Sequence, residues 1–448
     1  MKLRFEEQFV IFISILKWVI LSSVIGVAAG FSSSIFISIV HWITEKSILN
    51  KYSFYFLPVA LFATAWISEI FVHNDLGTDK IIEAINKNFG KIPSDSIPYK
   101  IINVLIILAA GGAAGKESPC AQLGAGISST FADILKVDDQ DRKKMVICGF
   151  SAGFATVFGT PIAGALFGIE VLFVGAIMYD VLLPSFISSI VAYHISSGLG
   201  ITYFRTPLSF VPVFTNNFFI TVVAFGIFLG LCSYLFIELI KLGKKVVSDI
   251  NLDTPYLGFI GGVILILLTL LSSRDYLGLG LNVIESSLRG DKIIWYAFVV
   301  KALFTSITLS STRSGSLITP IFFIGATAGN MFAQLFNIDI STFSAIGFVG
   351  LLAGTTNTPI ACSIMAVEMF GAGIAPYASI ACVLSFLMTG HNSLYSAQVL
   401  TLAKSRSVVI ETGKELQDAK IQIIFREKSW QQKVISFLKM LKHLFKKL

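Results

Sequence analysis

Long apolar runs, separated by short polar stretches, dominate the chain. The five clearest runs approach or exceed the roughly 20 residues needed to cross a hydrocarbon core about 30 Å thick. They cover residues 8–43, 53–73, 217–237, 255–272 and 375–390. A membrane-spanning β-barrel is built from short alternating segments, which this sequence lacks. The pattern therefore predicts an all-α protein that crosses the membrane several times.

Composition and charge agree with a membrane protein. Of the 448 residues, 54% are hydrophobic and 14% are charged, and the mean hydropathy is +0.79. The net charge of +7 is concentrated in basic clusters at 141–144, 241–245 and 433–448. Because segments rich in Lys and Arg stay in the cytoplasm, we expect these faces and both termini to be cytoplasmic, in a cell inner membrane.

The basic end of the chain is better explained by a lipid surface than by nucleic acid. In residues 433–448, Lys and His alternate with Phe and Leu. That pattern favours a helix lying along an anionic membrane face. We expect residues 401–448 to form a basic, amphipathic cytoplasmic tail, and we predict no nucleic-acid partner.

Two stretches of the chain repeat one pattern. Residues 149–175 align with residues 347–373 without a gap and share 9 of 27 positions, including Thr-Pro-Ile-Ala and a later Glu. Upstream, residues 115–125 and 316–326 each place a Pro five positions before a Gly-Ala pair. Two matched elements in the same order predict two related halves, and such proteins usually bind their substrate between the repeats. The predicted halves cover residues 1–215 and 216–400.

Each repeated element contains a hydroxyl residue followed by Pro. The four pairs are Ser118-Pro119, Thr160-Pro161, Thr319-Pro320 and Thr358-Pro359. A Ser or Thr hydroxyl can cap a free backbone N–H, and Pro is tolerated in the first turn, so each pair predicts a helix start. Helices that begin within apolar sequence would present their positive ends inside the membrane, where they can bind anions. The alternative is that the pairs only break helices at loops.

Glu117 stands directly before the first of these helix starts. A carboxylate there can occupy the place of the anion and move aside when it is protonated. Ionisable groups at membrane depth are costly and usually functional. The alternative is a surface loop in which Glu117 pairs with Lys116, but the small, apolar flanking residues are unusual for a loop.

Other charged residues give less indication of a functional role. Glu170 and Glu368 occupy matched repeat positions, which suggests a structural role near helix ends or a subunit contact. For Glu69, Lys301 and Arg313, isolated in apolar sequence, we expect snorkelling or local pairing and assign no role.

The sequence predicts no metal, cofactor or enzymatic chemistry. The cysteines have no CxxC or His spacing typical of a metal site, and we expect them to be buried and unpaired. They are Cys120, Cys148, Cys232, Cys362 and Cys382. With five His and no HExxH or Ser/His/Asp pattern, a membrane-embedded enzyme is disfavoured.

Four motifs together resemble the CLC family of anion channels and proton-coupled anion antiporters, over residues 10–400. GKESP at 115–119 resembles the family's GKEGP element, and GSLITP at 315–320 resembles its GxFxP element. GTPIAGALFGIEVL at 159–172 is similar to the following helix, and HNSLYSAQ at 391–398 contains the position of the pore-lining tyrosine.

The resemblance implies a CLC-like inverted-repeat helical bundle with broken helices, in a homodimer with one pore per subunit. Glu117 takes the place of the family's gating, proton-transferring glutamate. The helices after Pro161 and Pro359 would form the dimer contact. The implied anion-binding residues are Leu76, Gly77, Lys116, Ser118, Ser316, Ile318, Thr319 and Tyr395.

Departures from the chloride-type pattern indicate which branch of the family the sequence resembles. In NDLGTDKIIEAINKN (74–88), Leu76 replaces the serine that contacts chloride. Val171 stands at the position of a second, internal glutamate, and Ser118 replaces the middle Gly of GKEGP. The pattern resembles the bacterial fluoride/proton antiporter branch. It implies a fluoride/proton antiporter that exports fluoride with the proton gradient. The alternative is a chloride channel or chloride/proton exchanger of the same family.

Overall fold

The structure is a computed structural model, and it describes residues 2–50, 52–70, 77–93, 96–203, 215–405, 407–419 and 421–423. Sixteen α-helices make up most of this described part. Their bounds are α1 Lys2–Leu49, α2 Leu57–Ile70, α3 Thr78–Lys87, α4 Ser96–Ala109, α5 Glu117–Leu135, α6 Asp139–Phe158, α7 Pro161–Glu170, α8 Leu182–Gly198, α9 Asn216–Asp249, α10 Thr254–Leu271, α11 Leu281–Arg289, α12 Ala297–Thr312, α13 Ile318–Phe336, α14 Ile340–Thr356, α15 Pro359–Phe370 and α16 Ala375–Met388.

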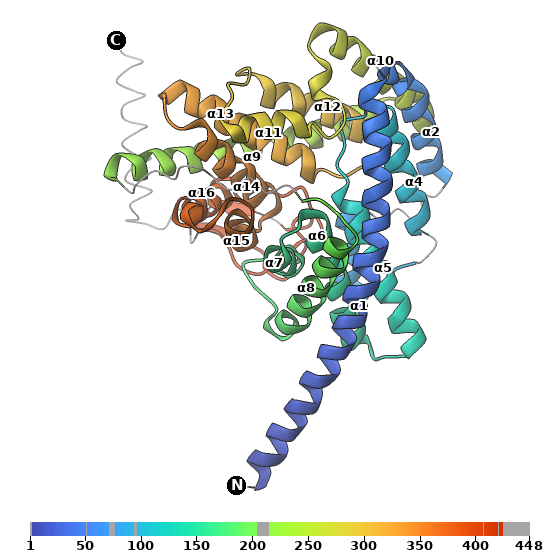
Figure 1. Cartoon of the computed structure of the whole chain (residues 1–448), viewed down its shortest axis with the longest axis vertical. Coiled ribbons are helices and arrows are strands. Elements are labelled where there is room, and N and C mark those ends of the chain that lie inside the picture. The colour runs from blue at the N-terminus through green and yellow to red at the C-terminus, as the bar shows by residue number, and fades with distance from the viewer. Residues whose placement is uncertain are drawn as a thin grey trace.

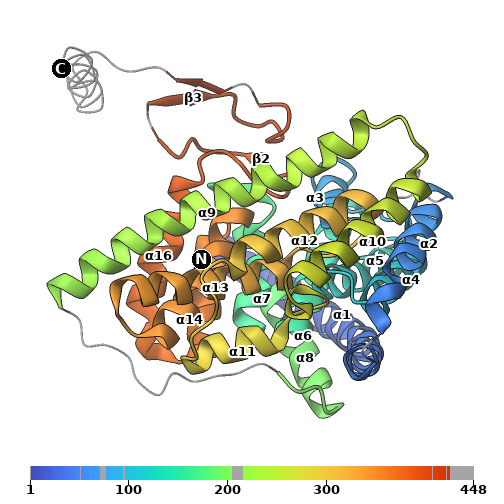
Figure 2. The same cartoon turned by 90° about the horizontal axis from the view of Figure 1, so that it is seen from above.

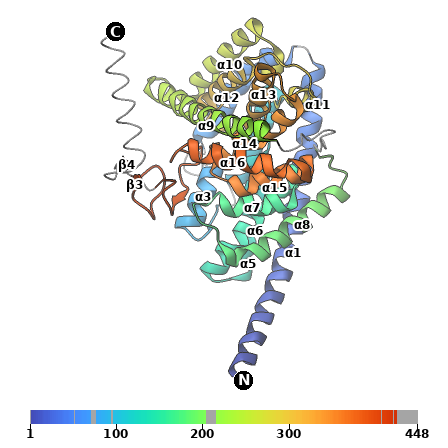
Figure 3. The ribbon, with the colours of Figure 1, turned by 90° about the vertical axis from the view of Figure 1, so that its left-hand side faces the viewer.

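Most helices lie with others from their own side of residue 215, but α2 packs against α10 and α12 from the other side. Figure 3 shows α9 to α14 gathered at one end and α5, α6 and α8 at the other, with α7 and α15 between them. In Figure 1, α1 runs along the edge of the bundle, and its N-terminal end projects from it. The division into two related halves, 1–215 and 216–400, stays a prediction.

Six helical segments in the described part are long and apolar enough to cross a membrane. They are Glu6–Leu49, Ser53–Ile70, Tyr179–Gly198, Asn216–Asp249, Thr254–Leu271 and Ile318–Phe336. Four of the five predicted apolar runs fall on these segments. The fifth, 375–390, forms only the 14-residue α16. That helix stops early because Gly390 turns the chain with a φ of 68°.

Glycines conserved between the two repeats let neighbouring helices touch. A Cβ on Gly124 of α5 would lie 2.0 Å from the carbonyl oxygen of Gly149 in α6. In the second repeat, a Cβ on Gly325 of α13 would lie 2.3 Å from the carbonyl oxygen of Gly347 in α14. The backbones therefore meet directly, as small residues allow in membrane helices. This contact explains why both repeats keep the same two glycines.

The predicted helix starts are present, but the predicted hydroxyl caps are wrong. Pro161 and Pro359 are the first residues of α7 and α15, where the missing N–H costs nothing. Thr160 and Thr358 precede them but make no side-chain capping bond. In the first element of each half, the hydroxyl residue is the second residue of its helix, because α5 begins at Glu117 and α13 at Ile318.

Two glutamates cap α7 and α15 reciprocally. Glu368 of α15 accepts hydrogen bonds from the amides of Ile162 (3.1 Å) and Ala163 (2.8 Å) at the start of α7. Glu170, at the end of α7, makes matching bonds of 3.1 and 2.8 Å to the first amides of α15. A carboxylate satisfies free amides and the helix dipole together. The prediction that these residues lie at helix ends is confirmed.

Strands connect the end of the membrane bundle to the tail. β1 (Phe173–Val174) pairs in parallel with β2 (Val399–Leu400), and β3 (Val408–Ile410) pairs antiparallel with β4 (Ile421–Ile423). Figure 2 shows β3 outside the helical body. The described part of the predicted tail therefore contains strands. The basic segment predicted as a surface helix, 433–448, lies outside the described residues.

The isolated charges behave differently from one another. Lys301 does not snorkel, because it is fully buried and donates to the carbonyl oxygens of Tyr276 (3.0 Å) and Gly278 (2.7 Å). These carbonyls replace the water that the ammonium loses. Glu69 and Arg313 are exposed.

The cysteines are free thiols, four of them buried and Cys232 half-buried. Among the described residues, no group of three or more His, Cys, Asp or Glu side chains could hold a metal ion.

Candidate functional site

Glu117 docks its carboxylate onto the start of α13, in the other half of the chain. Its oxygens accept hydrogen bonds from the Ser316 hydroxyl (3.0 Å), the Thr319 amide (3.2 Å) and the Thr319 hydroxyl. The side chain is only 2% exposed. These amide and hydroxyl donors at a helix N-terminus are suited to an anion. Glu117 thus lies where an anion could bind, and it does not form the exposed pair with Lys116 considered from the sequence.

The two repeat elements that contain these residues are joined directly. Gly115 and Ser316 form an antiparallel bridge, in which the Gly115 amide donates to the Ser316 carbonyl (2.7 Å). A Cβ on Gly115 would lie 2.3 Å from a Glu117 carboxylate oxygen and 3.1 Å from the Thr319 nitrogen. The docked carboxylate therefore needs glycine at position 115.

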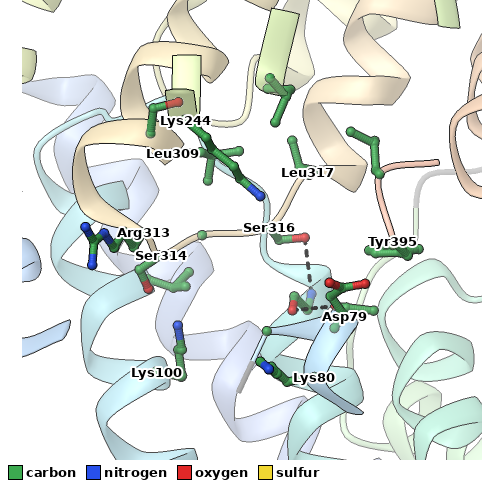
Figure 4. Close-up of a pocket in the computed structure, with 18 of the residues that line it drawn as sticks. Asp79, Lys80, Lys100, Lys244, Leu309, Arg313, Ser314, Ser316, Leu317 and Tyr395 are labelled. Atoms are coloured by element: carbon green, nitrogen blue, oxygen red, sulfur yellow. Dashed lines mark hydrogen bonds between the residues drawn. The ribbon is translucent and has the colours of Figure 1, made fainter. Parts of the chain in front are cut away.

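A cavity of about 420 Å³ lies on one side of Glu117, and we name it the Tyr395 cavity. Its lining includes Gly77, Thr78, Ser118, Gln122, Ser316 and Tyr395. In Figure 4, Lys100 and Arg313 lie on one side of it, and Ser316, Asp79 and Tyr395 on the other.

Basic side chains dominate the charge of the Tyr395 cavity. Lys80, Lys100, Lys244 and Arg313 line it, with Asp79 as the acidic residue among the described lining residues. A cleft lined mainly by one sign of charge concentrates ions of the opposite sign. This cavity can therefore gather anions.

A second cavity, of about 690 Å³, contains Glu117 itself, and we name it the Trp42 cavity. Its lining includes His41, Trp42, Glu45, Lys116, Glu117 and Thr319. Because Ser316 lines the Tyr395 cavity and bonds to Glu117 in the Trp42 cavity, the docked carboxylate forms part of the partition between the two.

Aromatic rings form one wall of the Trp42 cavity. Phe322 and Phe348 stack with centroids 3.8 Å apart and an interplanar angle of 8°. Phe158 packs edge-on against Phe322 at 5.5 Å. All three line the cavity that contains Glu117. They were missed from the sequence, where Phe is abundant in every apolar run.

Ser118 belongs to a small hydroxyl network on the Tyr395 side. Its oxygen lies 2.7 Å from the Thr78 hydroxyl and accepts from the Gln122 amide nitrogen (2.9 Å). Its backbone amide donates to the Ser316 hydroxyl (3.2 Å). Sequence reasoning missed Thr78 and Gln122. The i, i+4 spacing from Ser118 could have indicated Gln122, whereas nothing local indicated Thr78.

The other sequence-predicted residues fall around the same partition. Gly77 precedes α3 and lines the Tyr395 cavity, while Lys116 precedes α5 and lines the Trp42 cavity. Ile318 begins α13 and is fully buried. Tyr395 is 5% exposed, and its amide donates to the Ser393 hydroxyl (3.0 Å). The remaining predicted residue, Leu76, lies outside the described residues.

Comparisons with known proteins identify this architecture. Residues 59–390 match the family model described as voltage gated chloride channel. A chloride/fluoride channel protein from Pseudomonas syringae pv. tomato is 35% identical over 332 residues, covering 72% of this chain and 73% of that protein.

Solved structures agree on the fold. A crystal structure of a CLC-type fluoride/proton antiporter superimposes with a TM-score of 0.81 at 26% identity, covering 86% of this chain and 98% of the other. A slow cyanobacterial Cl⁻/H⁺ antiporter has the same fold, with a TM-score of 0.72 at 20% identity, covering 83% and 94%. The resemblance read from the sequence motifs is confirmed. The chain belongs to the voltage-gated chloride channel, or CLC, family and is a multi-pass membrane protein that transports anions.

Proposed function

We propose that this protein is a fluoride/proton antiporter in which Glu117 is both the gate and the proton carrier. One observation supports the proposal above the others: the buried Glu117 carboxylate occupies the donors at the start of α13, between two cavities. A carboxylate in that place competes with the transported anion for the same donors.

Protonation changes the balance of that competition. The ionised carboxylate accepts from Ser316 and Thr319 with full charge, and hydrogen bonds to charged groups are roughly twice as strong as neutral ones. A protonated Glu117 loses that advantage and leaves the donors to an anion. When the proton is released on the other side, the carboxylate returns and displaces the anion. Proton and anion then move in opposite directions.

The donors suit fluoride, a small and strong hydrogen-bond acceptor. The hydroxyls of Ser316 and Thr319 and the Thr319 amide already converge on one pair of oxygens. The names of the relatives supply independent support, since one is a chloride/fluoride channel protein and one a fluoride/proton antiporter. A pore-lining role for Leu76 rests on the sequence alone.

Basic contacts favour a cytoplasmic position for the Tyr395 cavity. Lys244, from the cluster at 241–245, lines this cavity, and neighbouring Lys241 donates to the Asn392 side chain (3.0 Å). Lys17 of α1 pairs with Asp141, the first residue of the basic segment 141–144, so the N-terminal part of α1 lies beside that segment. By the positive-inside rule, this side faces the cytoplasm of a cell membrane. Fluoride would enter through the Tyr395 cavity and leave through the Trp42 cavity.

Purified protein in liposomes provides the first test. Vesicles loaded with fluoride should release it while taking up protons, and an imposed proton gradient should drive fluoride uphill, since one pH unit supplies about 1.4 kcal/mol per proton. Fluoride electrodes and an internal pH dye measure both fluxes. Chloride movement at an equal or greater rate, or fluoride release without proton uptake, would contradict the proposal. The first outcome would favour a chloride channel or exchanger.

We also propose that the protein is a homodimer whose subunits meet through α7 and α15. These helices have 10 and 12 residues, about 15 and 18 Å long, too short to cross a hydrocarbon core of about 30 Å. Yet Ile162 and Ile360, near their starts, are 43% and 46% exposed. A second copy would cover these apolar side chains and the two short helices that carry them.

Replacing both Ile162 and Ile360 by Trp should shift the protein from dimer to monomer, because the larger rings would not fit between two close-packed copies. Single-molecule photobleaching in liposomes counts the subunits. Ile264→Trp, on α10 and 41% exposed, is the matched control and should leave the dimer intact. A wild-type monomer, or equal dimer populations in all three proteins, would refute this interface.

A further inference from the structure

Asp79 joins the start of α3 to the segment that follows Tyr395. One of its carboxylate oxygens accepts from the Ser396 hydroxyl (2.8 Å), and the other accepts from the Ala397 amide (2.9 Å). Asp79 and Ser396 are 317 residues apart in the sequence. Both oxygens hold the same short stretch of backbone, so the carboxylate acts as a two-point clamp.

The clamp lies at the cytoplasmic mouth of the pathway proposed above. Thr78 directly precedes Asp79, and Tyr395 directly precedes Ser396. Thr78 and Tyr395 both line the Tyr395 cavity, and Thr78 is linked to Ser118 by a hydroxyl contact of 2.7 Å. The contact between Asp79 and Ser396 therefore ties together the two segments that place Thr78 and Tyr395 at the mouth.

Other contacts hold the Tyr395 segment from the opposite side. The Leu394 amide donates to the Thr355 carbonyl of α14 (3.0 Å), and the Gln398 side chain donates to the Thr356 carbonyl (2.8 Å). β2 pairs with β1 just beyond. These contacts do not involve Asp79. Loss of its carboxylate should therefore loosen the mouth without unfolding the segment.

A different role for Asp79 would be to carry protons in place of the internal glutamate that Val171 replaces. The contacts argue against this role. Both oxygens are already occupied by an N–H and an O–H donor that belong to the backbone and side chain of the neighbouring segment. Both contacts hold the carboxylate against the segment after Tyr395 rather than against Glu117.

We propose that Asp79 is a positioning residue that holds Tyr395 against Thr78, and so keeps the cytoplasmic mouth narrow while Glu117 is undocked. The inference rests on the proposed antiport function. Coupled exchange requires that the pathway never be open at both ends together. If Glu117 controls one end, Thr78 and Tyr395, which line the Tyr395 cavity, are placed to control the other.

A second contact between the same elements provides a matched control. Glu415 is buried and pairs with Lys87 at the far end of α3 (2.8 Å). This hydrogen bond raises the pKa of the Lys87 ammonium. Glu415 and Lys87 do not line the Tyr395 cavity. Glu415→Gln therefore weakens the attachment of the tail to α3. It reaches Ser396 only through Gln417, whose side-chain oxygen accepts from Ser396 at 3.4 Å, and both Asp79 bonds stay in place.

The test compares wild type, Asp79→Asn, Asp79→Ala and Glu415→Gln in liposomes. Hydrogen exchange reports on the peptide that contains Ala397, and paired fluoride and proton fluxes report on coupling. Because hydrogen bonds to a charged group are strong, both Asp79 variants should exchange the Ala397 amide roughly tenfold faster or more. They should also release several fluoride ions per proton where wild type keeps a fixed ratio. Glu415→Gln should match wild type in both readings.

The outcomes separate the alternatives. Unchanged exchange at Ala397, or faster exchange with an unchanged flux ratio, would overturn the clamp as a determinant of coupling. Loss of proton flux with fluoride flux intact would instead make Asp79 a proton carrier, which also overturns the proposal. The wild-type arm alone reports on the antiport function. If wild-type protein shows no coupled fluoride transport, the proposed antiport function is wrong. The transport role of Asp79 is then wrong as well, regardless of how the variants behave.

Discussion

Glu117→Gln should abolish proton-coupled transport while leaving the protein folded. Glutamine has nearly the same shape and can still accept from Ser316 and the Thr319 amide, so the local structure should persist. It cannot take up or release a proton near neutral pH. Proton uptake in fluoride-loaded liposomes should therefore fall to the level of protein-free vesicles. Any remaining fluoride flux should run downhill only.

A second carboxylate in the same cavity makes the test specific. Glu45 lines the Trp42 cavity with Glu117, but it is exposed and lies 3.5 Å from His41, away from the α13 donors. Glu45→Gln should keep the wild-type ratio of fluoride to protons. If Glu117→Gln still couples the two fluxes, or Glu45→Gln loses coupling to the same degree, the proton carrier must be assigned elsewhere.

Local signals in the sequence predicted helix starts well. Pro161 and Pro359 begin helices because the effect of Pro on the first turn depends only on its immediate neighbours. Apolar length likewise predicted four of the membrane-spanning segments. Such features need no knowledge of the fold.

What could not be predicted were contacts between the two parts of the chain. Thr160 and Thr358 carry the residue type of a cap, yet distant Glu368 and Glu170 cap the helices instead. A carboxylate offers a full charge and two acceptors, which a hydroxyl does not. The sequence shows the residue types but not which helix end lies within reach.

Lys301 shows the same limit. The sequence led us to expect snorkelling or local pairing for this side chain. The tertiary structure instead supplies carbonyl oxygens from the loop before α11. The sequence does not show that this loop lies beside α12, so these acceptors could not be predicted.

The docking site of Glu117 was predicted in outline by the matched Pro elements. That Glu117 binds the start of α13, in the opposite half, was not, because the repeat pattern shows similarity but not proximity. Gly115 also escaped attention, although it stands two residues before Glu117. Its importance lies in a close approach that only the folded structure reveals.

Gly115→Ala should disturb the docking of Glu117 on α13 while leaving the Glu117 carboxyl group itself unchanged. The variant therefore tests the gating role of Glu117 separately from its role as proton carrier. The new Cβ would lie 2.3 Å from a Glu117 carboxylate oxygen, whereas its other close neighbours, the Thr319 nitrogen and the Ser316 carbonyl, are at 3.1 and 3.2 Å. The flexible carboxylate is the group that can move. Losing even one hydrogen bond to a charged group costs about 1.5–3 kcal/mol, so the docked population should fall roughly tenfold or more.

Fluoride release by Gly115→Ala should therefore be faster than wild type, because the docked Glu117 that closes the pathway is less populated. Proton movement should continue but with more fluoride per proton. Gly198→Ala is the matched control, because a Cβ there meets nothing within 4 Å. A rate of fluoride release identical to wild type would show that docking of Glu117 on α13 does not limit anion flow. The gate would then have to lie elsewhere, even if Glu117→Gln had removed proton coupling.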